Sequence, residues 1–384
     1  MNLAGRLAID LGAIAANWRA LDALSAPEVE TAAVVKADAY GCGAAEIGPA
    51  LARAGARSFF VALPGEGAEL RQALGPDPTI YILGGYAPPS PPSATQSPPP
   101  AGGRVREGNR IEEAARIDPD SPLYPTHDLR PVLNSAAQAA AWFRDHPRAP
   151  CAIQLDTGMN RLGMAAAEFA TLGPLPPAVR LVMSHLACAD QPGHHRNPAQ
   201  LAEFTRQTEA LPGIPRSLAA TAGILLGPGY HAHMTRPGIG LYGGWPFTAA
   251  RPVVTLHLPI IQIHDLAPGQ AVGYGAAWRA ERRARIATLS GGYDDGLIRA
   301  LGANARNGGA TGFIDGQPLP FAGRVSMDLI TLDVTDCPAA APGAMVEIVG
   351  PHQSIDDLAA AAGTIGHEIL TSLGSRYRRR YTGT

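Results

Sequence analysis

Strand and helix signals alternate along roughly the first 240 residues of this 384-residue chain. Short runs rich in β-branched and small residues are followed by segments whose apolar residues recur at helical spacing. Such repeats predict parallel strands that are each covered by a helix, and at this length they predict an α/β fold with a (β/α)8 barrel. The predicted barrel strands are 31–36, 58–63, 79–83, 131–134, 151–156, 180–185, 217–220 and 233–236.

The pattern changes near residue 245, where short extended runs separated by Gly, Pro and Asp predict a mainly-β domain. We therefore expect two domains, a barrel over 1–244 and a C-terminal β domain over 245–384. A strand around 7–9 and a helix N-cap at Asp10 begin the first domain. An insertion at 87–108 interrupts it and is expected to be an extended or disordered loop, because it is rich in proline and polar residues.

The bulk properties exclude several classes of protein. A formal net charge of −2 gives no electrostatic reason to expect nucleic acid or a membrane surface as a partner. No apolar run is long enough to span a bilayer, and the N-terminus lacks the apolar core of a signal peptide, so we expect a cytoplasmic protein. The four cysteines and the histidine pairs lack metal-ligand spacing, so no metal is expected. The arginines at 376–380 are expected to form a solvated face.

Lys36 is the only lysine of the chain, and it stands at the end of a predicted buried strand. Burial disfavours the charged form of an amine and lowers its pKa, which is the condition for a nucleophile that reacts with a carbonyl. The alternative is a strand-end lysine whose ammonium reaches solvent.

Other polar side chains also follow strands of the predicted barrel, where the functional groups of such barrels gather. They are Tyr40, Arg161, His185, Thr221 and Arg236. After Arg236, the glycines at 238 and 240 allow backbone amides to surround a phosphate. Taken alone, these glycines and the arginine favour an ordinary turn with a surface arginine over a phosphate site.

Six segments together resemble the alanine racemases, a family of fold-type III pyridoxal-phosphate enzymes. They are Ala32–Gly43, Asp156–Gly163, Thr235–Gly240, Ala271–Ala276, Ser290–Gly296 and Gly323–Asp328. The resemblance covers the chain from about residue 3 to 381, apart from the Pro-rich insertion. It implies reversible racemisation of L- and D-alanine, which would supply D-alanine for cell-wall peptidoglycan.

The resemblance implies two catalytic bases, because racemisation needs one on each face of a planar carbanion. Lys36 would hold pyridoxal 5'-phosphate and serve one face, and Tyr274 would serve the other. In the family the tyrosine comes from the partner subunit, which implies a homodimer with shared active sites. A chain of Arg236, His185 and Tyr274 would supply the charge that Tyr274 needs.

The remaining roles also follow from the resemblance. Cofactor-binding residues would be Lys36, Tyr40, His185, Thr221, Arg236, Gly238 and Ile239. Arg236 would donate to the pyridine nitrogen, since guanidinium stays charged and cannot accept a hydrogen bond. Arg161 and Met327 would bind the substrate.

Three positions depart from the family pattern. Gln154 stands where many members carry a carbamylated lysine, Ala220 where an asparagine is common, and Ser375 where some members have an entrance tyrosine. Ser375 keeps open a racemase of broader range or one that acts on serine. A non-catalytic cofactor-binding protein would resemble only the barrel half, and a decarboxylase would place a carboxylate where Arg236 stands.

Overall fold

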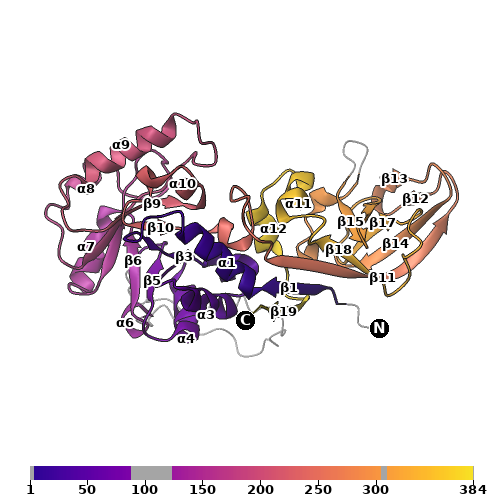
Figure 1. The fold of residues 1–384 in the computed structure, drawn as a ribbon, viewed down its shortest axis with the longest axis horizontal. Helices are drawn as coiled ribbons and strands as arrows, with labels where there is room; N and C mark the ends of the chain where they lie inside the picture. Colours follow the sequence, from indigo (N-terminus) through magenta and orange to yellow (C-terminus); the bar gives the residue numbers. More distant parts are fainter. Residues whose placement is uncertain (1–3, 88–122, 304–308, 384) are drawn as a thin grey trace, which may run out of the picture. The chain divides into compact units, whose positions relative to one another are not determined.

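The computed structural model describes residues 4–87, 123–303 and 309–383 (Figure 1). Contacts within the chain divide it into two compact units. Unit 1 consists of Met1–Leu24, Ala37–Gly55 and Pro237–Thr384, and unit 2 consists of Ser25–Lys36 and Ala56–Arg236. Most of the Pro-rich insertion expected at 87–108 lies outside the described residues.

A closed parallel barrel is the core of unit 2 (Figure 1). Its strands are β2 (Glu30–Thr31), β3 (Ala33–Val34), β4 (Ser58–Val61), β5 (Thr79–Ile82), β6 (Leu129–Leu133), β7 (Cys151–Gln154), β8 (Val179–Met183), β9 (Arg216–Ala220) and β10 (Met234–Arg236). The short pieces β2 and β3 are successive parts of one extended run; β2 pairs with β10, and β3 pairs with β4. That run closes the barrel at eight strand positions, so the predicted (β/α)8 barrel is confirmed.

The helices of unit 2 lie outside the barrel (Figure 1). They are α4 (Pro64–Leu74), α6 (Leu123–Thr126), α7 (Ala136–Asp145), α8 (Ala166–Ala170), α9 (Arg196–Thr208) and α10 (Thr221–Leu225). Helix α7 begins after Ser135, whose hydroxyl accepts a hydrogen bond from the Gln138 amide at 3.1 Å. Helix α9 buries Gln200, Phe204 and Thr208, which are spaced four apart on one face.

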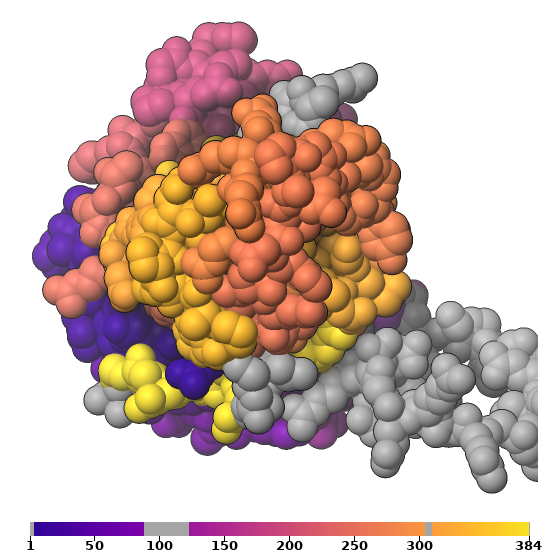
Figure 2. Space-filling model, turned by 90° about the vertical axis from the view of Figure 1, so that its right-hand side faces the viewer, coloured from indigo at the N-terminus to yellow at the C-terminus, as the bar shows by residue number. Residues whose placement is uncertain are grey.

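Unit 1 contains a large, mainly antiparallel sheet (Figure 1). Its strands are β1 (Arg6–Asp10), β11 (Val254–Leu266), β14 (Ala284–Ser290), β15 (Thr311–Ile314), β16 (Gln317–Pro320), β17 (Leu329–Asp333), β18 (Met345–Val349) and β19 (Arg378–Thr382). A separate hairpin pairs β12 (Ala271–Val272) with β13 (Trp278–Arg279). Figure 2 looks onto the part of this unit that follows residue 250, drawn in orange and yellow. The predicted mainly-β domain is therefore confirmed.

Strand β1 joins this sheet rather than the barrel. It pairs antiparallel with β11 and parallel with β19. The residues before Leu24 therefore belong to unit 1, although the sequence places them in the first domain. The domain boundary near residue 244 stays a prediction.

Helices complete unit 1 beside its sheet. They are α1 (Leu11–Asp22), α2 (Lys36–Gly41, which starts one residue before the unit does), α3 (Ala44–Ala54), α11 (Ile355–Ala362) and α12 (Gly366–Ser372). The predicted N-cap is confirmed, because the Asp10 carboxylate accepts a hydrogen bond from the Ala13 amide at 2.9 Å. No helix among the described residues is long and apolar enough to cross a membrane.

Candidate functional site

Lys36 directly follows the first extended run of the barrel, at the carboxyl end of its strands. Its side chain is half-buried. Burial lowers the pKa of its amine, the Arg161 guanidinium lowers it further, and the Glu66 carboxylate opposes them. An amine with a lowered pKa is more often unprotonated at neutral pH, which makes it a better nucleophile.

Arg236 ends the last barrel strand and is 3% exposed. Its Nη2 donates to the Ser184 carbonyl oxygen at 2.7 Å, and its Nη1 donates to the Ser217 hydroxyl. Burial lowers the pKa of Arg236 to about 9, so the guanidinium is still protonated at neutral pH. Within the described part of the chain no carboxylate forms an ion pair with it. Arg236 is therefore a buried cation of the barrel that no described carboxylate neutralises, and its guanidinium has further N–H groups that can donate hydrogen bonds.

His185 follows β8 on the same rim. Its pKa is lowered to about 3, first by burial and then by the cations Arg236, Arg161 and Lys36. The imidazole is therefore neutral at physiological pH. The electrostatic coupling brings these four predicted site residues of unit 2 together in one group.

Gln200 ties two strand ends of this rim together, and sequence reasoning missed it. Its side chain is 2% exposed. Its Nε2 donates to the His185 carbonyl oxygen at 3.0 Å and to the Thr157 hydroxyl at 3.3 Å, and its Oε1 accepts from the Ala187 amide at 2.8 Å. Because Gln200 lies on helix α9, a search restricted to strand ends could not find it.

The loop that carries Arg161 is braced by side chains at its base. The Asp156 carboxylate accepts hydrogen bonds from three successive amides, Gly158 to Asn160, at 2.8 to 3.1 Å. Gln154, which is 5% exposed, donates to the Leu162 carbonyl oxygen at 3.1 Å. Gln154, one of the positions that depart from the family pattern, thus holds the backbone next to Arg161. The Arg161 side chain itself is exposed.

Thr221 is the first residue of α10, directly after β9, and it is 3% exposed. Ala220 precedes it and lines a hollow in the rim, whose walls are His185, the loop after it and the first turn of α10.

The segment after Lys36 forms a left-handed turn in unit 1. Ala37 to Tyr40 all have φ between 51° and 56°, although none of them is glycine. L-residues in this conformation cost about 1–2 kcal/mol each, so the surroundings must impose it. The Asp38 carboxylate accepts from the Ala44 amide at 2.7 Å, and Arg379 Nη1 donates to the Gly41 carbonyl oxygen at 2.7 Å.

The left-handed turn places Tyr40 in an aromatic cluster within unit 1. Tyr40 is 7% exposed, and its ring stacks on Tyr242 at 4.4 Å between centroids. Burial raises the pKa of Tyr40 to about 12, so its hydroxyl keeps its proton and can donate a hydrogen bond.

Gly238 and Ile239 begin the short 3-10 helix η2 (Ile239–Tyr242) of unit 1. Asn17, on α1, donates to the Leu241 carbonyl oxygen at 3.1 Å and to the Arg251 carbonyl oxygen at 2.9 Å. The Arg251 amide donates back to Asn17 at 2.7 Å. This buried asparagine fixes the backbone of the segment for which phosphate binding is predicted.

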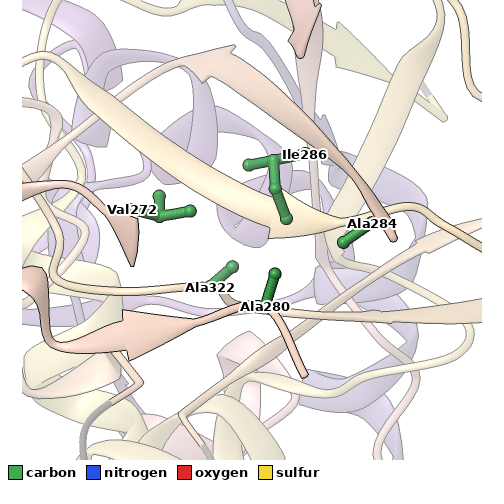
Figure 3. Packing of buried hydrophobic residues seen from close by; sticks show 5 residues of the cluster. All are labelled: Val272, Ala280, Ala284, Ile286 and Ala322. Carbon is green, nitrogen blue, oxygen red and sulfur yellow. The ribbon is translucent and has the colours of Figure 1, made fainter. Parts of the chain in front are cut away.

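Tyr274 lies at the tip of the β12–β13 hairpin and is 72% exposed. A cluster of small apolar side chains anchors the hairpin to β14 (Figure 3). Its members are Val272, Ala280, Ala284, Ile286 and Ala322. This cluster holds the base of the hairpin, while the Tyr274 phenol at its tip is exposed.

Met327 is 53% exposed and directly precedes Asp328, whose carboxylate is bound by Arg376. Arg376 donates two hydrogen bonds to Asp295, at 2.7 and 2.6 Å, and one to Asp328 at 2.6 Å. These carboxylates raise the pKa of Arg376, with Asp295 contributing most. Arg376 is exposed, as expected for a solvated face, but it also pairs with Asp294 at 3.3 Å, so three carboxylates that are distant in sequence surround it.

The structure thus groups the predicted site residues in two sets. Unit 2 holds Lys36, Arg161, His185, Thr221 and Arg236, and unit 1 holds Tyr40, Gly238, Ile239, Tyr274 and Met327. The first set combines an amine of lowered pKa, a buried guanidinium and a neutral imidazole.

Comparison with known proteins identifies the family to which this architecture belongs. Residues 9–97 and 104–246 match the model of the alanine racemase N-terminal domain, and residues 253–381 match that of its C-terminal domain. An alanine racemase of Dinoroseobacter shibae is 50% identical over 379 residues, which are 98% of each chain. One of Rhizobium meliloti is 43% identical over 406 aligned residues, covering 100% of this chain and 98% of that one.

Solved structures agree with the sequence comparison. The alanine racemase of Bartonella henselae, solved with covalently bound pyridoxal phosphate, superposes with a TM-score of 0.84 at 34% identity, covering 99% of this chain and 100% of that chain. The biosynthetic alanine racemase of Pseudomonas aeruginosa gives the same values. With both family models matched in order and the fold reproduced over the whole length, this chain belongs to the alanine racemase family.

Proposed function

We propose that this chain interconverts L- and D-alanine with pyridoxal 5'-phosphate as its cofactor. In this proposal the enzyme acts in the cytoplasm and supplies the D-alanine from which peptidoglycan is made. The observation that supports this best is the position of Lys36. The only lysine of the chain ends a barrel strand, and its amine pKa is lowered by burial and by Arg161. An amine of this kind suits covalent attachment to the aldehyde of the cofactor.

The residues present fit the cofactor. Arg236 is a buried cation without a carboxylate partner among the described residues, and it can donate to a ring nitrogen that carries a lone pair. His185 is neutral, so it can lie beside the ring without adding a second charge. Thr221, Gly238, Ile239 and Tyr40 would hold the phosphate with a hydroxyl, two amides and a phenol.

When bound, pyridoxal phosphate supplies an electron-withdrawing ring that stabilises the negative charge left on the α-carbon of alanine. Arg236 keeps the ring nitrogen unprotonated, because guanidinium donates its hydrogen bond without giving up its proton. With that nitrogen unprotonated, Arg236 would favour reversible proton removal over transamination. Arg161, at the tip of its braced loop, would orient the substrate.

Two groups would move the proton. Lys36 Nζ would take or return it on one face of the α-carbon, and the Tyr274 hydroxyl would do so on the other. Tyr274 and Met327 are exposed in this chain at 72% and 53%. Their exposure supports a homodimer in which the partner subunit's Tyr274 and the partner subunit's Met327 complete each site.

The test is a coupled assay of alanine racemisation in both directions, with serine as a second substrate. We expect equal conversion in both directions at equilibrium and a faster rate with alanine than with serine. Lys36→Ala should abolish the activity, and borohydride should fix the cofactor to the wild-type peptide that contains Lys36. Because no other lysine exists, attachment to any other peptide, or full activity of Lys36→Ala, would refute the assignment.

A further inference from the structure

The guanidinium of Arg236 is buried while its two hydrogen-bond acceptors in the described structure are neutral oxygens. Taking a cation out of water is unfavourable unless other groups replace its hydration. Burial is the cause that lowers the pKa of Arg236, which reflects this cost. A further interaction must therefore stabilise Arg236 in its place.

The ring of Phe60 provides that interaction. The guanidinium carbon of Arg236 lies over this ring, 5.9 Å from its centroid. Phe60 is 0% exposed on strand β4, and its carbonyl oxygen accepts from the Val35 amide at 2.9 Å. The face of an aromatic ring attracts a cation, and this attraction grows when both are removed from water.

The ring of Tyr81 stacks on the ring of Phe60 and supports it. Phe60 and Tyr81 are directly paired on β4 and β5, and their rings stack at 4.8 Å between centroids with 14° between their planes. Tyr81 is in turn paired with Arg130 on β6, whose guanidinium lies 5.9 Å from the Tyr81 centroid. One cross-strand row of three residues thus fixes the ring on which Arg236 rests.

We propose that Phe60 is a positioning residue for Arg236: its ring face holds the buried guanidinium in the orientation from which it donates to the ring nitrogen of the cofactor. The proposal rests on the proposed function, since it takes Arg236 as the partner of that nitrogen. In this role Phe60 acts through Arg236 rather than on the reacting atoms. Its effect is therefore to be sought in the Arg236–nitrogen hydrogen bond rather than in the chemistry of Lys36.

The test compares two ligands on the full-length chain after its cofactor has been removed with hydroxylamine. One ligand is pyridoxal phosphate, and the other is the analogue in which C–H replaces the ring nitrogen. The ratio of their dissociation constants isolates the hydrogen bond to the nitrogen. We expect the wild type to prefer pyridoxal phosphate about tenfold, which corresponds to about 1.4 kcal/mol.

Phe60→Leu should reduce this preference to about threefold or less, because it removes the ring face but keeps an apolar side chain. Phe59→Leu is the matched control. Phe59 is also 0% exposed, but it is adjacent on β4 and points to the opposite side of the sheet. It should show a similar loss of stability with the wild-type preference retained. If Phe60→Leu does not fold, Phe60→Met, whose flexible side chain fills the same space, takes its place.

An unchanged ligand preference in the Phe60 variant would overturn the proposal. So would an equal loss in Phe59→Leu, because the effect would then be general loosening of the barrel. A wild type that racemises alanine but binds both ligands equally would overturn the role of Phe60 and leave the proposed function intact. A wild type that binds neither ligand and racemises no alanine would overturn both.

Discussion

Acid should destabilise unit 2 through His185, and the size of this effect follows from its surroundings. The imidazole has a pKa of about 3 in the folded chain and about 6.5 when unfolded. Since the folded pKa is the lower one, the unfolded state binds the proton first as the pH falls. Stability from neutral His185 is present above pH 6.5 and is lost progressively down to about pH 3.

The expected loss between pH 7.5 and pH 5.0 is about 2 kcal/mol, because 1.5 pH units below the unfolded pKa are worth about 1.4 kcal/mol each. This figure requires only that the folded pKa lie well below 5. His185→Gln removes the titration while keeping a polar side chain. The free energy of unfolding of the variant should therefore fall by about 2 kcal/mol less than that of the wild type over this range.

Urea unfolding of the cofactor-free protein, followed by tryptophan fluorescence and far-UV circular dichroism, measures the difference. The comparison between variant and wild type at each pH cancels the other titrating groups. His195→Gln, at an exposed histidine of the same unit, should behave as the wild type does. Parallel pH profiles for His185→Gln and the wild type would refute the reasoning, since His185 would then titrate alike in both states.

Two further predictions concern the reaction. Arg236→Glu should favour a protonated ring nitrogen, so racemisation should fall while slow transamination, measured as pyruvate release, should rise; an unchanged rate and absorbance spectrum would show that Arg236 does not face the ring. Lys36→Ala and Tyr274→Phe should each be severely impaired, yet subunit exchange between them should restore roughly a quarter of the sites, because a mixed dimer places both changes in one site and leaves the other intact. Mixed dimers that form without any return of activity would mean that Tyr274 acts within its own subunit or is not the second base.

The sequence was sufficient to predict the elements whose signals are local. Helix α1 begins where its N-cap, Asp10, predicts, and the barrel strands follow from their buried runs. Lys36, His185 and Arg236 could be found because charged or titratable side chains at the ends of buried strands are costly without a function. The structure couples these three electrostatically, together with Arg161.

Features that depend on distant partners could not be predicted. Two alanines and Tyr40 give no local reason for the left-handed turn over Ala37 to Tyr40, which is followed by a Gly41 carbonyl bonded to Arg379 near the end of the described chain. The membership of β1 in the sheet of unit 1 depends on β11 and β19. Gln200 and Phe60 have ordinary positions in a helix and a strand, and only the folded barrel shows which groups they touch.

The pairing of β1 also has a consequence for folding during synthesis on the ribosome. Arg6 pairs with Arg378, so β1 waits for one of its two partners, β19, until almost all of the described chain has been made. At about 5–20 residues per second, synthesis of the intervening chain takes roughly 20–75 seconds. The other partner of β1, strand β11, is made earlier, directly after the barrel residues 56–236. We therefore expect the barrel to fold during translation, with closure of the sheet of unit 1 following only after the last strand is released.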